Sequence, residues 1–229
     1  MKILGLIGGI SWISTIDYYR YINLAVNKRL GGNEFSECII YSVNYGEIIR
    51  HNEAQDFEGT FNIISEACEH LKNSGAVAIV LCANTMHMFA DALEEKIGLP
   101  VIQVAVATAT EIHKNGLKKI GLLGTKLTME MDFFKQKLAA QNIESIIPNE
   151  DDRNFIHEKI FSELGKGIIK DETKSRYLSI IEKLISEGVE GIVLGCTEIP
   201  LIIKQSDVNV PVFDTSSIHS EAAVAWAFD

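Results

Sequence analysis

The chain has 229 residues, of which 47% are hydrophobic and 23% are charged, and its formal net charge at pH 7 is −10. This composition is ordinary for a globular protein with one or two small domains, and the negative charge disfavours nucleic acid and anionic membranes as partners. No apolar stretch approaches the roughly 20 residues that a membrane span needs.

The four cysteines, at positions 38, 68, 82 and 196, show neither metal-ligand spacing nor a disulfide framework. We therefore expect no metal site and a cytoplasmic protein with reduced thiols. Residues 1–10 are apolar, but they contain three glycines and lead into a polar segment, which predicts a buried first strand rather than a signal peptide.

Strands and helices alternate along the first half of the chain. Apolar runs without polar alternation predict strands that are covered on both faces, as in parallel sheets. The expected strands are 3–7, 38–43, 77–81 and 100–104, and the expected helices are 14–29, 57–72, 88–96 and a linking helix that includes 108–115.

The second half of the chain repeats this alternation. The expected strands are 120–123, 145–147, 192–194 and 212–213, and the expected helices are 129–141, 153–164, 173–187 and 217–227. Residues 149–153 carry four charges, and we expect them to form a solvated loop.

Three segments of the first half recur in the second half, in the same order and at nearly constant offsets of 116, 113 and 111 residues. The matched segments are 4–9 with 120–125, 69–85 with 182–198, and 100–103 with 211–214. Such self-similarity indicates duplication of one α/β unit.

The predicted fold is therefore α/β, with two similar lobes that each contain a parallel-rich sheet flanked by helices. We expect the first lobe to span residues 1–104, joined by the terminal helix 215–229, and the second lobe to span 105–214. No linker rich in Pro, Gly or Ser divides the halves, so we expect the lobes to pack around one cleft that holds the active site.

Polar residues follow one buried strand in each half, at 83–85 and at 196–198. In open parallel sheets, ligands bind beyond the carboxyl ends of the strands. Asn84, Thr85 and Thr197 provide side-chain donors there, and backbone N–H groups at the following helix starts suit a carboxylate. These two segments, which we call the elbows, are the candidate ligand site.

The repeat aligns Ala83 with Cys196. Two thiols on opposite sides of a small amino acid would racemise it, because one thiolate removes the α-proton and the other thiol returns a proton from the far side. This chemistry requires thiols whose pKa is lowered towards neutrality. Only position 196 is a cysteine, and strand alternation directs Cys82 away from the face of Ala83, so we expect Cys82 to be a core thiol.

The segments 8–15, 81–87 and 194–199, together with 213–215 and 218–219, resemble the aspartate/glutamate racemase family. The resemblance covers essentially the whole chain and is strongest to the bacterial broad-specificity or L-aspartate/glutamate-specific branch. It implies cofactor-independent racemisation of aspartate, glutamate or both, two α/β lobes, and commonly a homodimer.

The family's first motif is Cys-Asn-Thr-x-His and its second is Gly-Cys-Thr-Glu, and each cysteine serves as a base. By this resemblance Cys196 is one base. Ala83 occupies the position of the other, where members of the similar branch carry threonine. Alanine has no proton to exchange, so the resemblance predicts one-sided or impaired activity.

The remaining candidates fall into two groups. The substrate-binding candidates are Ser11, Asn52, Asn84, Thr85, Thr197 and Glu198. The possible pocket residues are Gly9, Arg50, Cys82, His87, Thr125 and His219. Among them, we expect Glu198 to support Cys196 or to cap the next helix, and His87 to orient its elbow.

Two other functions remain open at this point. A decarboxylase of the same superfamily needs only one cysteine, which protonates one face of a malonate-type acid, and Ala83 suits that pattern. A protein that binds an amino acid without turnover is the other alternative, and the intact Gly-Cys-Thr-Glu motif argues against it.

Overall fold

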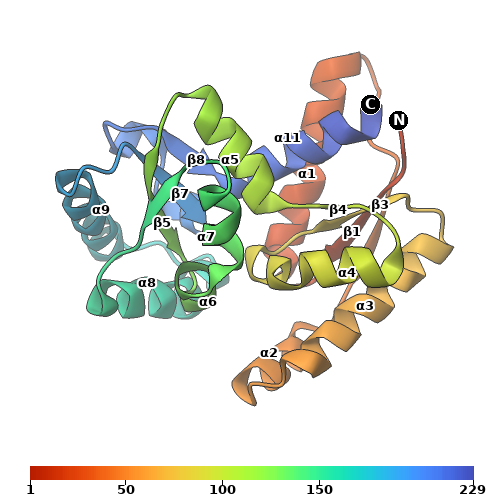
Figure 1. Cartoon of the computed structure of the whole chain (residues 1–229), viewed down its shortest axis with the longest axis horizontal. Coiled ribbons are helices and arrows are strands. Elements are labelled where there is room, and N and C mark those ends of the chain that lie inside the picture. Colours follow the sequence, from red (N-terminus) through yellow and green to blue (C-terminus); the bar gives the residue numbers. More distant parts are fainter. The chain divides into compact units, whose positions relative to one another are not determined.

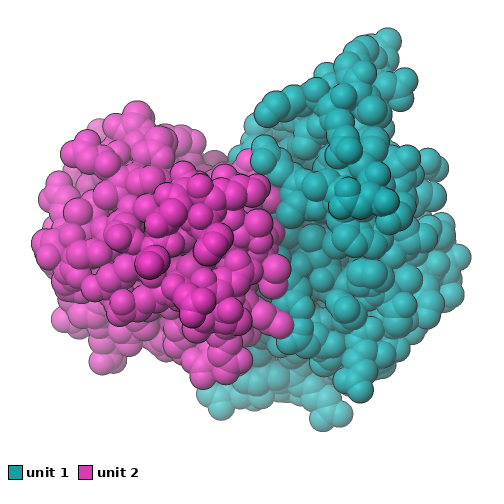
Figure 2. Space-filling model, turned by 45° about the horizontal axis from the view of Figure 1, so that its top comes forward, with its two compact units in different colours: residues 1–103, 219–229 teal, residues 104–218 magenta.

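A computed structural model describes all 229 residues of the protein. The chain forms two compact units, which Figure 2 distinguishes by colour. Unit 1 contains residues 1–103 and 219–229, and unit 2 contains residues 104–218. The last helix, α11 (Thr215–Phe228), contributes its first four residues to unit 2 and the others to unit 1.

Unit 1 is built on a four-stranded parallel sheet in the order β2-β1-β3-β4. Its strands are β1 (Leu4–Gly8), β2 (Cys38–Ser42), β3 (Ala78–Leu81) and β4 (Val101–Ile102). Its helices, besides the end of α11, are α1 (Trp12–Leu30), α2 (Tyr45–Glu53), α3 (Phe57–Asn73), the 3-10 helix η1 (Asn84–Phe89) and α4 (Ala90–Ile97). Helices α1 and α11 cover one face of the sheet, and α3 and α4 cover the other (Figure 1).

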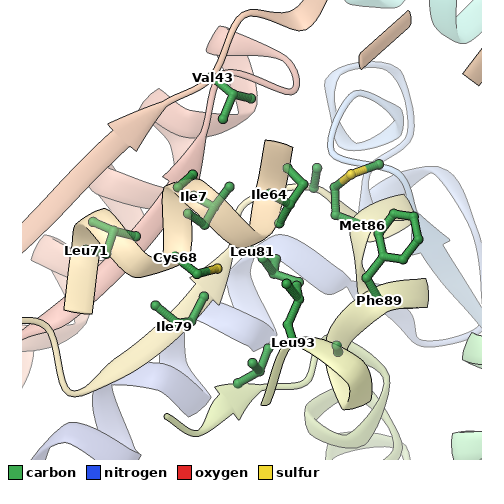
Figure 3. Close-up of a cluster of buried hydrophobic side chains, with 14 of the residues drawn as sticks. Ile7, Val43, Ile64, Cys68, Leu71, Ile79, Leu81, Met86, Phe89 and Leu93 are labelled. Atoms are coloured by element: carbon green, nitrogen blue, oxygen red, sulfur yellow. The ribbon is translucent and has the colours of Figure 1, made fainter. Parts of the chain in front are cut away.

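The core beneath α3 and α4 fixes the end of β3. Figure 3 shows Leu81, the last residue of β3, among side chains from α3 and α4. Met86 and Phe89 of η1 enter the same cluster. Because residues on both sides of the first elbow are buried in one core, the path of the chain through the elbow is held at both ends.

Unit 2 repeats this architecture, with a four-stranded parallel sheet in the order β6-β5-β7-β8. Its strands are β5 (Lys119–Gly124), β6 (Glu144–Ile146), β7 (Gly191–Gly195) and β8 (Val212–Asp214). Its helices are α5 (Val104–Lys114), α6 (Lys126–Glu130), α7 (Asp132–Ala139), α8 (Glu150–Ser162), η2 (Leu164–Lys166), α9 (Asp171–Ser186), α10 (Ile199–Ile202) and η3 (Gln205–Asp207), besides the start of α11.

Helices α8 and α9 cover one face of the second sheet, and α5 and α7 cover the other (Figure 1). Both sheets are parallel, and strands β1, β3, β5 and β7 are buried on both faces, as the apolar runs predicted. The expected covering of the strand at 38–43 is wrong, because β2 is an edge strand whose residues are half-buried or exposed. Their equivalent strand orders confirm the duplicated α/β architecture.

The expected solvated loop at 149–153 is wrong, because Glu150 begins α8. The side chain of Asn149 caps this helix by accepting a hydrogen bond from the Asp152 N–H, at 2.9 Å. Carboxylates are favourable in a first helical turn. Asp152 is buried, and its carboxylate pairs with Arg176 and Lys183 of α9. The run of charges therefore forms the first turn of a helix, and Asp152 anchors that turn to α9.

Two further boundaries differ from the sequence prediction. Helix α2 was not expected, and the expected helix 129–141 is divided into α6 and α7. Met131 separates them, because its φ of −75° and ψ of 159° are extended rather than helical. No helix of the protein has the length and apolar character required to cross a membrane.

Candidate functional site

The first elbow follows β3 at the carboxyl edge of the unit 1 sheet. Ala83 has an extended backbone, with φ −153° and ψ 124°, and precedes η1. Ala83 packs in the cluster under α3 and α4, whereas Cys82 packs in the cluster under α1 and α11. The two side chains thus point to opposite faces of the sheet, as the alternation rule predicted. Burial raises the pKa of Cys82, which is a core thiol.

Backbone and side-chain hydrogen bonds hold this elbow. The Met86 N–H donates to the Ala83 carbonyl at 3.2 Å, and His87 Nε2 lies 3.2 Å from the Leu81 carbonyl oxygen. Asn84 is buried, and Thr85 is partly exposed. The segment that follows is a six-residue 3-10 helix, so the elbow offers local amide donors rather than the dipole of a long α-helix.

Gly9 and Ser11 lie at the same edge of the sheet, because β1 is the neighbour of β3. Gly9 has a φ of +91°, its N–H donates to Thr15 Oγ1 at 2.8 Å, and a Cβ there would clash with the Val43 carbonyl oxygen. The turn therefore requires glycine. Ser11 precedes α1, and its side chain makes no capping hydrogen bond to that helix.

Asn52 and Arg50 lie on α2. Asn52 Oδ1 accepts a hydrogen bond from Thr60 Oγ1 of α3 at 3.0 Å. Arg50 is exposed, and its guanidinium lies 4.0 Å from the Glu47 carboxylate. The contacts of these two side chains join them to α2 and α3, not to the 83–85 elbow.

His219 is fully buried, and both of its ring nitrogens have partners in unit 1. Its ring is a core group that links α11 to α1 and β4, and a place for it in a ligand pocket stays a prediction. His87 lies beside it, with the two ring centroids 5.0 Å apart.

The second elbow follows β7 in unit 2, and two of its side chains donate hydrogen bonds to Glu198. The Cys196 thiol donates to Glu198 Oε2 at 2.9 Å, and the Thr197 hydroxyl donates to the same oxygen at 2.7 Å. Cys196 is 8% exposed and Glu198 is 7% exposed. Glu198 precedes α10 without a side-chain capping bond to it, and its carboxylate accepts from the Cys196 thiol instead.

The expected lowering of the Cys196 pKa is wrong for this arrangement. Burial raises the pKa of Cys196 well above its ordinary value, and the negative charge of Glu198 raises it further. Hydrogen bonds from the backbone N–H groups of residues 197 and 198 lower the pKa of Cys196, but by less than burial and Glu198 raise it. The resting group is therefore a protonated thiol that is hydrogen-bonded to a carboxylate.

Thr125 lies near this elbow, because the ends of β5 and β7 are paired at Gly124 and Gly195. Its side chain caps α6 by accepting from the Thr128 N–H at 3.3 Å. Sequence reasoning missed Tyr177, a buried residue of α9 that belongs to the same hydrophobic cluster as Cys196 and whose pKa is raised mainly by burial. Its helical spacing indicates only a core position, so the sequence carries no signal for its proximity to the thiol.

The sequence profile of the Asp/Glu/hydantoin racemase family matches residues 7–223, which is nearly the whole chain. The protein belongs to this family.

Solved structures agree with this assignment. A Yersinia pestis protein assigned as an Asp/Glu racemase is 46% identical, with a TM-score of 0.94 and complete coverage of both chains. An aspartate racemase homologue from Pyrococcus horikoshii is 36% identical, with a TM-score of 0.86 and complete coverage of both chains. Among relatives found by sequence rather than by structure, a glutamate racemase of Leptospira borgpetersenii is 29% identical over 68% of this chain and 59% of its own length.

Proposed function

We propose that this protein is a cofactor-independent racemase of aspartate, glutamate or both, and that Cys196 exchanges the α-proton. The observation that carries the proposal is the 2.9 Å hydrogen bond from the Cys196 thiol to Glu198 at the carboxyl end of β7. Membership of the racemase family and the glutamate and aspartate racemases among its relatives support the substrate class.

The geometry of Cys196 and Glu198 supports a two-step proton transfer. Glu198 accepts the thiol proton, and the Cys196 thiolate then removes the α-proton of the substrate as a general base. The electron pair of the broken C–H bond delocalises into the substrate carboxylate. Asn84, Thr85 and Thr197 are our candidate donors to that carboxylate, because hydrogen-bond donors stabilise charge that develops in the transition state.

The alanine at position 83 limits the reaction that Cys196 can catalyse alone. Cys196 removes and returns a proton on one face of the α-carbon, whereas inversion requires a proton on the other face. Alanine supplies none, so we expect α-proton exchange to exceed inversion and to begin preferentially from one enantiomer.

Proton NMR in D₂O tests this proposal. L- and D-aspartate and L- and D-glutamate are incubated with the wild-type protein and with Cys196→Ser, and loss of the α-proton signal is followed. We expect exchange from one enantiomer of at least one amino acid and a 10²–10⁴-fold slower rate in the variant, the range for loss of a general base. Equal exchange by Cys196→Ser would disprove the role of Cys196.

The protonated resting thiol also favours a second function, decarboxylation of a disubstituted malonate. There the C–C bond to one carboxylate breaks, CO₂ leaves, and the Cys196 thiol protonates the resulting carbanion. Measured release of CO₂ from such a malonate, without α-proton exchange of amino acids, would support this function over racemisation.

We also propose that the protein is a homodimer. Helix α1 exposes three large apolar side chains at helical spacing, Trp12 at 66%, Ile16 at 54% and Tyr19 at 49%. A set of exposed apolar residues on one face favours burial by a partner. Sedimentation velocity of the wild type and of Ile16→Glu measures the mass of the protein in solution. A monomer mass in both proteins would contradict the proposal.

A further inference from the structure

The buried imidazole of His219 connects three elements behind the first elbow. One ring nitrogen lies 2.6 Å from the Ile102 carbonyl oxygen of β4, and the other lies 2.8 Å from the Tyr18 hydroxyl of α1. We infer that His219 is a positioning residue that holds His87, and through it the first elbow, in a single arrangement. The catalytic consequence of this inference rests on the proposed function, whereas its structural part does not.

The partners of His219 determine its tautomer. A carbonyl oxygen only accepts hydrogen bonds, so Nε2 must carry the proton that is donated to Ile102. In a neutral ring Nδ1 is then an acceptor, and the Tyr18 hydroxyl donates to it. Burial lowers the pKa of His219 to about 4, which agrees with a neutral ring at physiological pH. Every polar atom of the imidazole is satisfied in this one orientation.

His219 reaches the elbow through the ring of His87. The two rings are nearly perpendicular, with an interplanar angle of 73° and centroids 5.0 Å apart, so they pack edge to face. His87 Nε2 in turn lies 3.2 Å from the carbonyl oxygen of Leu81, the residue that ends β3. Residues 82–86, including the elbow, therefore lie between a backbone carbonyl and a side chain that are hydrogen-bonded to each other.

His219 also lies where the chain re-enters unit 1. Ile102 is one residue before the point at which the chain leaves that unit, and His219 is the first residue after its return. Four residues earlier, the Thr215 hydroxyl donates to the Leu194 carbonyl of β7 in unit 2, at 2.8 Å. Within unit 2 the start of α11 is thus hydrogen-bonded to β7, and within unit 1 His219 is hydrogen-bonded to β4, the strand beside β3.

Three variants test the inference. His219→Gln keeps a donor for Ile102 but loses the ring that packs on His87 and the acceptor for Tyr18. Tyr18→Phe keeps both rings and removes only the hydroxyl. Val26→Ala is the matched control, because Val26 is buried in the same α1 core but has no contact role at the elbow.

The first readout is hydrogen exchange of the peptide 81–89, which does not depend on turnover. We expect His219→Gln to accelerate its exchange at least tenfold and Tyr18→Phe to have a smaller effect, with Val26→Ala close to wild type. Equal acceleration in Val26→Ala and His219→Gln would overturn the inference, because the effect would then be general loss of core packing.

The second readout is α-proton exchange of aspartate or glutamate. Because the elbow is our proposed carboxylate site and Cys196 is untouched, we expect His219→Gln to raise KM at least tenfold with a smaller change in kcat. An unchanged KM alongside a lower kcat would overturn the catalytic part. If the wild type shows no exchange, the proposed function fails, and the hydrogen-exchange result still decides the structural role of His219.

The third readout is the imidazole nitrogen spectrum of the folded wild type. We expect His219 to show the Nε2-protonated tautomer with a slowly exchanging ring proton, unchanged between pH 8 and pH 5. Titration near the ordinary histidine pKa, or the other tautomer, would overturn the inference.

Discussion

At the scale of single residues, the protonation state of Cys196 is the main finding about the second elbow. A sequence with cysteine between glycine and threonine suggests a thiolate, but the thiol here donates to a buried carboxylate. The electrostatic effect of Glu198 opposes ionisation of Cys196, while its oxygen provides an acceptor for the thiol proton. Burial and the same carboxylate together keep the resting thiol protonated, and the carboxylate oxygen is also the acceptor closest at hand for the thiol proton.

The variant Glu198→Gln separates these two effects. Removing the negative charge should lower the pKa of Cys196, although burial should still keep it above the ordinary value. Removing the proton acceptor should slow α-proton exchange by 10²–10⁴-fold. The pKa is measured from the pH dependence of thiol alkylation, with Cys196→Ser to identify the signal.

Glu163→Gln is the control for that experiment. Glu163 is another buried carboxylate of unit 2, but it accepts from Thr173 at 2.7 Å and pairs with lysines instead of the thiol. It should leave the titration of Cys196 nearly unchanged. A Cys196 pKa that rises in Glu198→Gln would contradict the electrostatic account.

Part of this site was predictable from the sequence. Alternation along β3 placed Cys82 and Ala83 on opposite faces, because side-chain direction in a strand depends only on position. The raised pKa of Cys196 and the nearby Tyr177 were not predictable, since both depend on burial and on groups brought together by the tertiary structure.

At the scale of elements, the charged segment at the start of α8 shows that composition alone can suggest the wrong structure. Four charges in five residues resemble a solvated loop, yet three of them form the first helical turn after the Asn149 cap. The sequence pattern of asparagine followed by acidic residues was sufficient to suggest a helix start. The burial of Asp152 was not predictable, because its partners Arg176 and Lys183 lie on α9.

The Asn149 cap makes a measurable contribution to stability. Asn149→Ala should lower the free energy of unfolding of unit 2 by about 1 kcal/mol, because the Asp152 N–H loses its acceptor. Urea unfolding followed by circular dichroism measures this. Asn154→Ala in the same helix is the matched control, since Asn154 Oδ1 is buried without a hydrogen-bond partner and its removal should be neutral or stabilising. Equal losses in both variants would contradict the capping role.

At the scale of the whole molecule, the duplicated fold was the most predictable feature. The offsets of the repeat matched β1 with β5, β3 with β7 and β4 with β8, and the two sheets have equivalent strand orders. The positions of the strands follow from the hydrophobic pattern, which acts over long segments and tolerates local errors. The missed helix α2 has no counterpart in the matched segments, which explains why the repeat did not reveal it.

The buried histidines of unit 1 should make the protein sensitive to mild acid. The pKa of His219 is lowered to about 4 from an ordinary 6.5, and burial lowers that of His87 as well. The unfolded chain therefore binds more protons than the folded chain between these values, and stability falls as the pH drops below 6.5. The limiting slope is about 1.4 kcal/mol per pH unit for each such histidine.

Carboxylates act in a lower pH range. The pKa of Glu163 is lowered to about 2 from 4.5 by Thr173 and the neighbouring lysines, so its contribution to stability is lost only as the pH falls below 4.5.

Urea unfolding at pH 7, 6 and 5 should show the effect of the histidines on the free energy of unfolding. The variant His219→Gln should reduce the slope of that free energy against pH. An identical slope in that variant would assign the pH dependence to other groups.

The central claim is that Cys196 exchanges protons on one face while Ala83 leaves the other face without a partner. The most direct test compares α-proton exchange with inversion in D₂O for the wild type, Ala83→Cys and Cys196→Ser. We predict that exchange exceeds inversion in the wild type, that Ala83→Cys brings the two rates together, and that Cys196→Ser loses both. Inversion as fast as exchange in the wild type, or full exchange in Cys196→Ser, would contradict the claim.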